Sequence, residues 1–194
     1  MKKYLLSFTA ATVLAIDMRT LAKDYLLSPN WSNVLLHVKK DNLLQRRTVS
    51  TSSRIASELI VRLQQLDMEE LDYLVNSDME SCKMLSWVAI CRAYDFIRDF
   101  MAEVVREHYL VGIMDVTYTD YATFINMKSA FHPELNTVTE TTIKKLRQVL
   151  FRMMKEAGII EPKKRIIPTI MPPSLLNLLP HEDYLCFPMF VREN

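Results

Sequence analysis

Basic and hydroxyl side chains between Thr137 and Ile170 have the types and spacing needed to contact a polyanion. Residues 143–157 contain no Pro or Gly, and the threonines before them offer N-cap hydroxyls, so this stretch predicts a helix. At 100° per residue, one side of the helix is apolar and the other is basic and polar. The polar side carries Thr141, Lys144, Lys145, Gln148 and Arg152. Such a face is typical of a helix that contacts duplex DNA.

A basic turn follows this helix. Gly158 is one of only two glycines in the chain and predicts the helix end. Apolar pairs at 159–160 and 166–167 predict two short strands, with Lys163, Lys164 and Arg165 in the turn between them. This order of parts predicts a winged helix-turn-helix with a wing-like β-hairpin. The alternative is an ordinary amphipathic helix whose solvated side carries Lys and Arg.

A second group of anion-binding residue types precedes a helix predicted from about Ser52 to Gln65. A short helix with Trp31 and Val34 on its buried side lies before it, so the two helices resemble a helix-turn-helix. Hydroxyls and helix-terminal amides can hold phosphate oxygens at such an entrance. The candidate DNA contacts here are Arg46, Arg47, Ser50, Ser52 and Arg54. A capped helix with its arginines in solvent is an equally good interpretation.

Candidate catalytic and metal-binding residues are scattered. The four histidines form no His-x-x-x-His pair, and the three cysteines have no metal-ligand spacing, so we predict buried, reduced thiols and no metal site. Asp99 and Glu103 are four residues apart, but Arg98 and Arg106 lie close by and favour a surface charge network. We therefore predict no enzymatic activity and no cofactor.

The composition predicts an all-α protein. The 194 residues include only two glycines, against eight prolines, which is too few glycines to build a glycine-rich nucleotide-binding loop. The net charge is only +1, but it is unevenly distributed. Residues 37–65 carry six basic and two acidic side chains, residues 66–80 six acidic and none basic, and residues 139–165 eight basic and three acidic. Two basic segments on either side of an acidic one favour a nucleic-acid partner.

We expect one compact, multi-helix domain spanning residues 1–194. Its parts would be a helix-turn-helix-like segment at 1–66, a central helical hub at 67–112 and a winged-helix-like segment at 113–194. The hub should hold two or three long helices, broken near residues 93–95, and Gly112 should end it. A helix from about Tyr118 to Phe131 should precede the basic helix, a short one should run from Pro172 to Leu179, and residues 186–191 should form a strand or an extended tail.

The N-terminal residues could be mistaken for a secretory signal. Lys2 and Lys3 precede an apolar run from Tyr4 to Ile16. However, an apolar helical stripe continues through the supposed cleavage site, at Leu14, Met18, Leu21, Ala22 and Tyr25. We therefore expect one amphipathic helix, with no membrane contact and a cytoplasmic location; a membrane-associated or exported protein is the alternative.

Several separated motifs resemble the BrxA family, a core component of bacteriophage exclusion (BREX) phage-defence systems. The resemblance covers Phe8 to Ile167. It rests on residues 42–54, on Cys91-Arg92-Ala93-Tyr94-Asp95-Phe96-Ile97-Arg98, on His132-Pro133-Glu134-Leu135 and on residues 146–158.

This resemblance implies an all-helical, non-enzymatic, cytoplasmic protein that binds double-stranded DNA through helix-turn-helix elements. It also implies that the other BREX subunits, which include a methyltransferase and large ATPases, are partners. A scaffold or adaptor that joins these subunits, with only incidental DNA contact, is the alternative. Because one chain would carry two DNA-binding elements, we expect a monomer.

Overall fold

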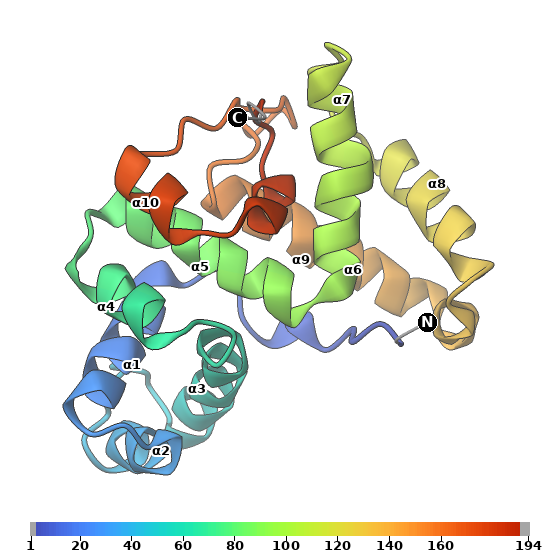
Figure 1. Cartoon of the computed structure of the whole chain (residues 1–194). Helices are drawn as coiled ribbons and strands as arrows, with labels where there is room; N and C mark the ends of the chain where they lie inside the picture. The colour runs from blue at the N-terminus through green and yellow to red at the C-terminus, as the bar shows by residue number, and fades with distance from the viewer. Residues whose placement is uncertain (1–2, 191–194) are drawn as a thin grey trace. The chain divides into compact units, whose positions relative to one another are not determined.

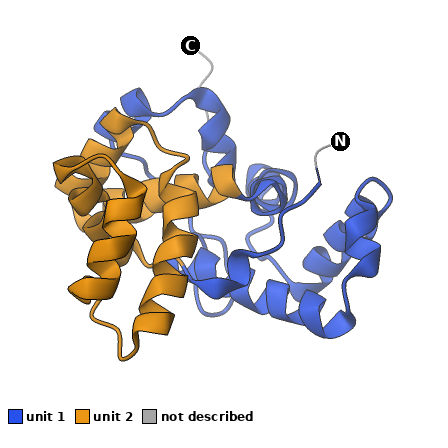
Figure 2. Cartoon of the chain, turned by 90° about the horizontal axis from the view of Figure 1, so that it is seen from below, with its two compact units in different colours: residues 1–12, 94–194 blue, residues 13–93 orange. Residues whose placement is uncertain are grey.

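The computed structural model describes residues 3–190, and every regular element within this range is helical (Figure 1). The all-α prediction is therefore confirmed. The chain forms two compact units, one of residues 13–93 and the other of the N-terminal segment to Thr12 together with the chain from Tyr94 onward (Figure 2). The division at Tyr94 lies within the segment 67–112 that the sequence suggested as one hub.

The unit of residues 13–93 contains five helices, and α1, α2 and α3 pack on one another. α4 packs against α1 and α5, and α5 also contacts α1 and α3. The interior is formed by apolar side chains such as Met18, Leu21, Val34, Leu59 and Leu85. The helices are α1 (Ala15–Leu27), α2 (Trp31–Lys40), α3 (Val49–Leu63), α4 (Met68–Asn76) and α5 (Met79–Ala93).

Side-chain caps fix where these helices begin. The Asn30 side chain accepts hydrogen bonds from two backbone N–H groups at the start of α2, and Thr48 accepts one from Thr51 N at the start of α3. Asp67 and Glu70 form a reciprocal capping box at the start of α4. Because Thr48 is the cap, α3 begins at Val49, three residues before the predicted start at Ser52.

The N-terminal segment is not the single amphipathic helix that we expected. Leu14 adopts a left-handed backbone conformation (φ 50°), so α1 begins only at Ala15, and a short 3₁₀ turn, η1 (Phe8–Ala10), precedes it. Met18, Leu21 and Ala22 are nevertheless buried, as the apolar stripe predicted. Within residues 3–190, none of the helices has the length and apolar character needed to cross a bilayer.

The other unit is built around a run of helix from Asp95 to Leu110. α6 (Asp95–Phe100) continues through a π-helical segment, η2 (Met101–Arg106), into α7 (Glu107–Leu110). The predicted break near residues 93–95 is confirmed, because Tyr94 leaves the helical conformation (φ −129°, ψ 91°). The remaining elements are α8 (Tyr118–Ser129), η3 (Pro133–Thr137), α9 (Glu140–Glu156), α10 (Pro173–Leu178) and η4 (His181–Cys186).

Aromatic side chains form the core of this unit. Phe96 and Phe100 of α6 each make edge contacts with Tyr121 and Phe124 of α8, at centroid distances of 5.3–6.1 Å. Tyr4 also contacts Phe96, so the N-terminal segment packs on the same cluster. α8 is thereby attached to α6 along its buried side, while its other side remains in solvent.

A charge network surrounds the predicted Asp99 and Glu103 pair. Lys128 Nζ lies 3.4 Å from Asp99 and 2.5 Å from Glu103, and Arg98 also contacts Asp99 at 3.6 Å. The Tyr4 hydroxyl donates to Asp99 at 2.6 Å. The surface-network interpretation is confirmed, with Lys128 rather than Arg106 as the second cation.

The C-terminal part follows the predictions in part. α10 spans most of the helix expected from Pro172 to Leu179. Residues 186–190 form no strand, and Val191 lies outside the described residues. Thr169 N donates to Pro188 O at 3.0 Å, which ties this extended segment to the chain after α9. Cys82, Cys91 and Cys186 are all buried, as predicted for core thiols.

Candidate nucleic-acid interface

α9 has the two different sides that the sequence predicted. Thr139 caps it by accepting a hydrogen bond from Thr142 N at 3.2 Å. The inward side is buried through Leu146, Val149, Leu150, Met153 and Met154. Because this side is anchored in the core, the opposite side is held in solvent in a fixed orientation.

The outward side of α9 is basic. Its predicted contact residues are all exposed: Thr141, Lys144, Lys145, Gln148 and Arg152. Lys144 pairs with Glu140 at 2.6 Å, and this pair lowers the pKa of the Glu140 carboxyl. Both side chains of the pair are exposed, so it is a weak interaction that an anion could replace. Within residues 3–190, Lys145 and Arg152 have no carboxylate partner.

α9 ends at Glu156, and a Schellman motif with Gly158 at its C′ position follows. Gly158 has φ 76°, its N–H donates to Lys155 O at 3.2 Å, and Ile159 N donates to Met154 O at 2.9 Å. The predicted role of this glycine as the helix terminator is confirmed. The chain therefore reverses direction directly after the last turn of α9.

The predicted wing-like β-hairpin is wrong. Ile160 and Ile166 form one isolated bridge, and Arg165 forms another with Asp115, but residues 3–190 contain no strand. Pro162 has no N–H to donate, and Lys164 turns the chain with φ 67°. The segment after the turn also bonds to the chain before α8, since Ile166 N donates to Met114 O at 2.7 Å. The result is a basic turn, residues 161–165, with Lys163 and Arg165 exposed and Lys164 half-buried.

Tyr118, at the start of α8, connects the basic turn to α9. The Lys164 ammonium lies 3.5 Å from the centre of the Tyr118 ring, and the Arg147 guanidinium carbon lies 4.1 Å from it. Phe151 of α9 contacts the same ring edge-on at 5.0 Å. Neither Tyr118 nor Arg147 is among the contacts predicted from the sequence. Arg147 lies at the edge of the apolar side of α9, and no spacing rule links either residue to Lys164.

The predicted contacts before α3 are only partly available. Arg47, Ser50 and Arg54 are exposed. Arg46 forms an ion pair with Asp17, whose pKa is raised by burial although Arg46 opposes the rise. Ser52 is fully buried, so its assignment as a DNA contact was wrong. It occupies the first turn of α3, which begins earlier than predicted, and faces the interior.

Comparison with known proteins identifies the family. The family model for BrxA matches residues 2–183. The chain belongs to the BrxA family. It is 30% identical over 128 residues to the BREX protein BrxA of Bacillus cereus, covering 64% of this chain and 62% of that protein. It is 24% identical over 149 residues to the BREX protein BrxA of Escherichia coli, covering 77% of this chain and 70% of that protein.

A solved structure has the same fold as this BrxA-family chain. The crystal structure of an uncharacterized protein from Magnetospirillum magneticum aligns with a TM-score of 0.81. The alignment covers 95% of this chain and 98% of that one, at 16% sequence identity. This likeness describes the fold alone.

The two basic groups of the BrxA-family chain belong to different units. Arg47, Ser50 and Arg54 lie in the unit of residues 13–93, whereas α9, the basic turn and Tyr118 lie in the other. No cluster of three or more metal-ligating side chains occurs within residues 3–190. The most developed candidate site is therefore the basic surface of α9 with the turn that follows it.

Proposed function

We propose that this chain is a non-catalytic, double-stranded-DNA-binding component of a BREX phage-defence system. The outward face of α9 carries the proposal, because its exposed cations are held on a helix whose other side is buried. The names of the two BrxA relatives support the role in BREX. Other BREX subunits are then expected partners.

Phosphate contacts should dominate the binding. On α9 and the basic turn, Gln148 is the one amide side chain available for base reading. The exposed or half-buried cations there are Lys144, Lys145, Arg147, Arg152, Lys155, Lys163, Lys164 and Arg165. Contacts from Lys and Arg to phosphates position a protein on duplex DNA without reading its sequence. We therefore expect strong salt dependence and limited sequence preference.

Salt titration of DNA binding tests this function. Fluorescence anisotropy with a labelled duplex of about 20 base pairs would give affinities at several salt concentrations, and a scrambled duplex would measure sequence preference. A protein that contacts about five phosphates has a slope of about −4.5 in log affinity against log salt. Absence of binding at low salt would rule out the proposed function.

A double charge reversal on α9 tests the location of the site. Lys144→Glu with Lys145→Glu places two carboxylates on the outward face, so duplex affinity should fall by at least about 100-fold through lost contacts and added repulsion. Lys23→Glu with Lys83→Glu, at two exposed positions in the other unit, changes the net charge equally and is the matched control. Both variants should keep the wild-type circular dichroism spectrum. Equal affinity losses in the two variants would contradict the assignment of α9.

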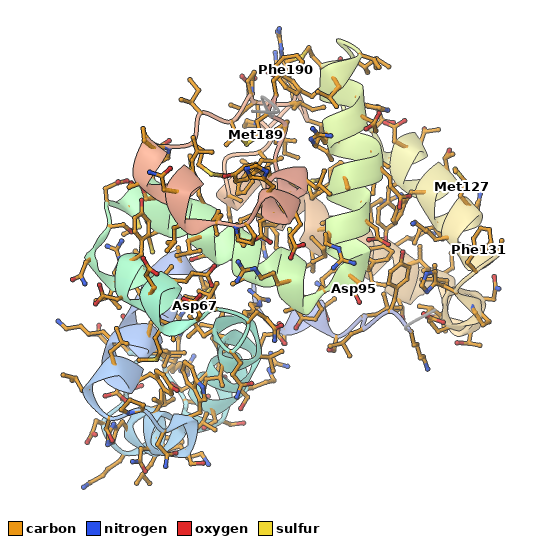
Figure 3. All side chains as sticks on the ribbon, viewed as in Figure 1. Asp67, Asp95, Met127, Phe131, Met189 and Phe190 are labelled. Carbon is orange, nitrogen blue, oxygen red and sulfur yellow. The ribbon has the colours of Figure 1, made fainter. Side chains whose placement is uncertain are left out.

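An adaptor function is the second candidate. Met127 lies near the end of α8 and Phe131 in the turn that follows it, and each is 65% exposed (Figure 3). Two exposed apolar side chains four residues apart are suited to a protein partner. Adaptor function would be favoured if the α9 charge reversal left duplex affinity unchanged while Met127→Ser with Phe131→Ser weakened binding to the purified BREX subunits.

A further inference from the structure

The contact of two cations with one tyrosine ring is the least expected feature of the basic surface. Arg147 comes from α9, Lys164 from the basic turn and Tyr118 from the start of α8, so three separate elements meet at one ring. The Tyr118 side chain is well exposed, at 42%, and Arg147 and Lys164 are half-buried. The cluster is thus open to solvent on at least one side.

The electrostatics of this cluster are unbalanced. Both positive groups lie within 4.1 Å of the ring centre, so two like charges are held against one ring and repel each other. Neither Arg147 nor Lys164 has a carboxylate partner among residues 3–190. Attraction to the negative face of the ring offsets part of this repulsion. An anion that contacts both cations would offset the rest.

The backbone holds Lys164 in place. Its N–H donates to Glu161 O at 2.8 Å, and its carbonyl accepts from Val116 N, two residues before Tyr118, at 3.1 Å. Its left-handed conformation (φ 67°) defines the turn. The ammonium is therefore directed over the ring by an ordered main chain as well as by the attraction of the ring.

We infer that Tyr118 is a positioning residue that holds Arg147 and Lys164 as a clamp for a phosphodiester of duplex DNA. This inference rests on the proposed function and adds Tyr118 and Arg147 to the contacts predicted from the sequence. The aromatic face does the positioning, because no hydrogen bond to the Tyr118 hydroxyl is present among residues 3–190. Two cations oriented in advance lose less side-chain freedom when they bind a phosphate than two mobile ones would.

Substitutions at Tyr118 distinguish the contribution of the aromatic ring to duplex affinity from that of the hydroxyl. Tyr118→Phe keeps the aromatic face and should retain wild-type duplex affinity and salt slope. Tyr118→Leu keeps apolar bulk but removes the aromatic face. Duplex affinity should therefore fall about tenfold, and the salt slope should become shallower by about 1 to 2. Tyr118 is partly exposed, so both variants should unfold near the wild-type temperature, which a thermal scan would check.

Two charge-removing variants keep the inference testable if Tyr118→Leu fails to fold. Lys164→Asn removes the ammonium with a residue that tolerates the left-handed conformation, and Arg147→Gln removes the guanidinium. Each should make the salt slope shallower by about 0.9. When Lys164→Asn or Arg147→Gln is added to Tyr118→Leu, duplex affinity should fall by less than the same substitution causes in the wild type. The leucine variant has already lost the orientation of both cations.

The outcomes distinguish this inference from the proposed function. If the wild type binds no duplex at low salt, the proposed function and the inference both fail. If the wild type binds and the Lys144 and Lys145 reversal abolishes binding, but Tyr118→Leu keeps the wild-type affinity and slope, only the inference fails. Inorganic phosphate at constant ionic strength should displace no more duplex than chloride does. Stronger displacement from the wild type than from Tyr118→Leu would indicate a site for free phosphate and overturn the assignment to DNA.

Discussion

At the scale of single residues, the register of a helix decides which expected contacts can reach a ligand. Ser50 and Ser52 are two residues apart in the first turn of α3, yet Ser50 is exposed and Ser52 is fully buried. The prediction placed Ser52 in the cap before the helix, whereas Thr48 is the cap and α3 begins at Val49. Inside the helix, Ser52 lies on the same side as the buried Ala56 and Leu59, four and seven residues later.

Ser52→Ala provides a direct check of this register. The Ser52 hydroxyl is buried and has no hydrogen-bond partner among residues 3–190, an arrangement that costs free energy in the folded state. Alanine removes this cost and is also the better helix former. We expect the free energy of unfolding to rise by about 1 kcal/mol in urea titrations, with no change in duplex affinity. A drop in affinity with unchanged stability would return Ser52 to the list of DNA contacts.

At the scale of elements, the helix ends carried strong local signals and could be predicted. Thr139 caps α9, and Gly112 and Gly158 each follow a helix with positive φ. The two segments of the predicted wing do meet at the Ile160–Ile166 bridge, but this pairing is too short to form strands. Ile166 N bonds instead to Met114 O, about 50 positions away, and local sequence signals do not specify such a contact. The Tyr118 cluster was missed for the same reason. Its three elements meet only after α8 and α9 have packed.

Gly158→Ala tests how strongly the end of α9 is specified. No atom would obstruct a Cβ at this position, but φ is 76°, so the penalty comes from the backbone conformation alone. Alanine in the left-handed region costs about 1 to 2 kcal/mol, and asparagine costs less because it tolerates that conformation. Chemical denaturation should therefore rank stability as wild type, Gly158→Asn, then Gly158→Ala. Equal stability of all three proteins would show that the Schellman motif contributes little.

At the scale of the whole molecule, the chain offers one basic group in each compact unit. The group before α3 is smaller than predicted, since Arg46 is paired with Asp17 and Ser52 is buried, which leaves Arg47, Ser50 and Arg54. Arg47 and Arg54 have no carboxylate partner among residues 3–190. We propose that both groups contact DNA, and that a single chain carrying both needs no dimer for a two-point grip.

Neutralising each group separately tests the two-point grip. Arg47→Gln with Arg54→Gln removes two cations from one unit, and Lys144→Gln with Lys145→Gln removes two from the other. If both groups contact one duplex, each pair should make the salt slope shallower by about 1.8, and the quadruple variant by about twice as much. The losses should add because the two pairs share no partner. Wild-type affinity and slope in the Arg47 and Arg54 variant would show that its arginines are only solvated, leaving α9 and the basic turn as the sole DNA-binding surface proposed for this chain.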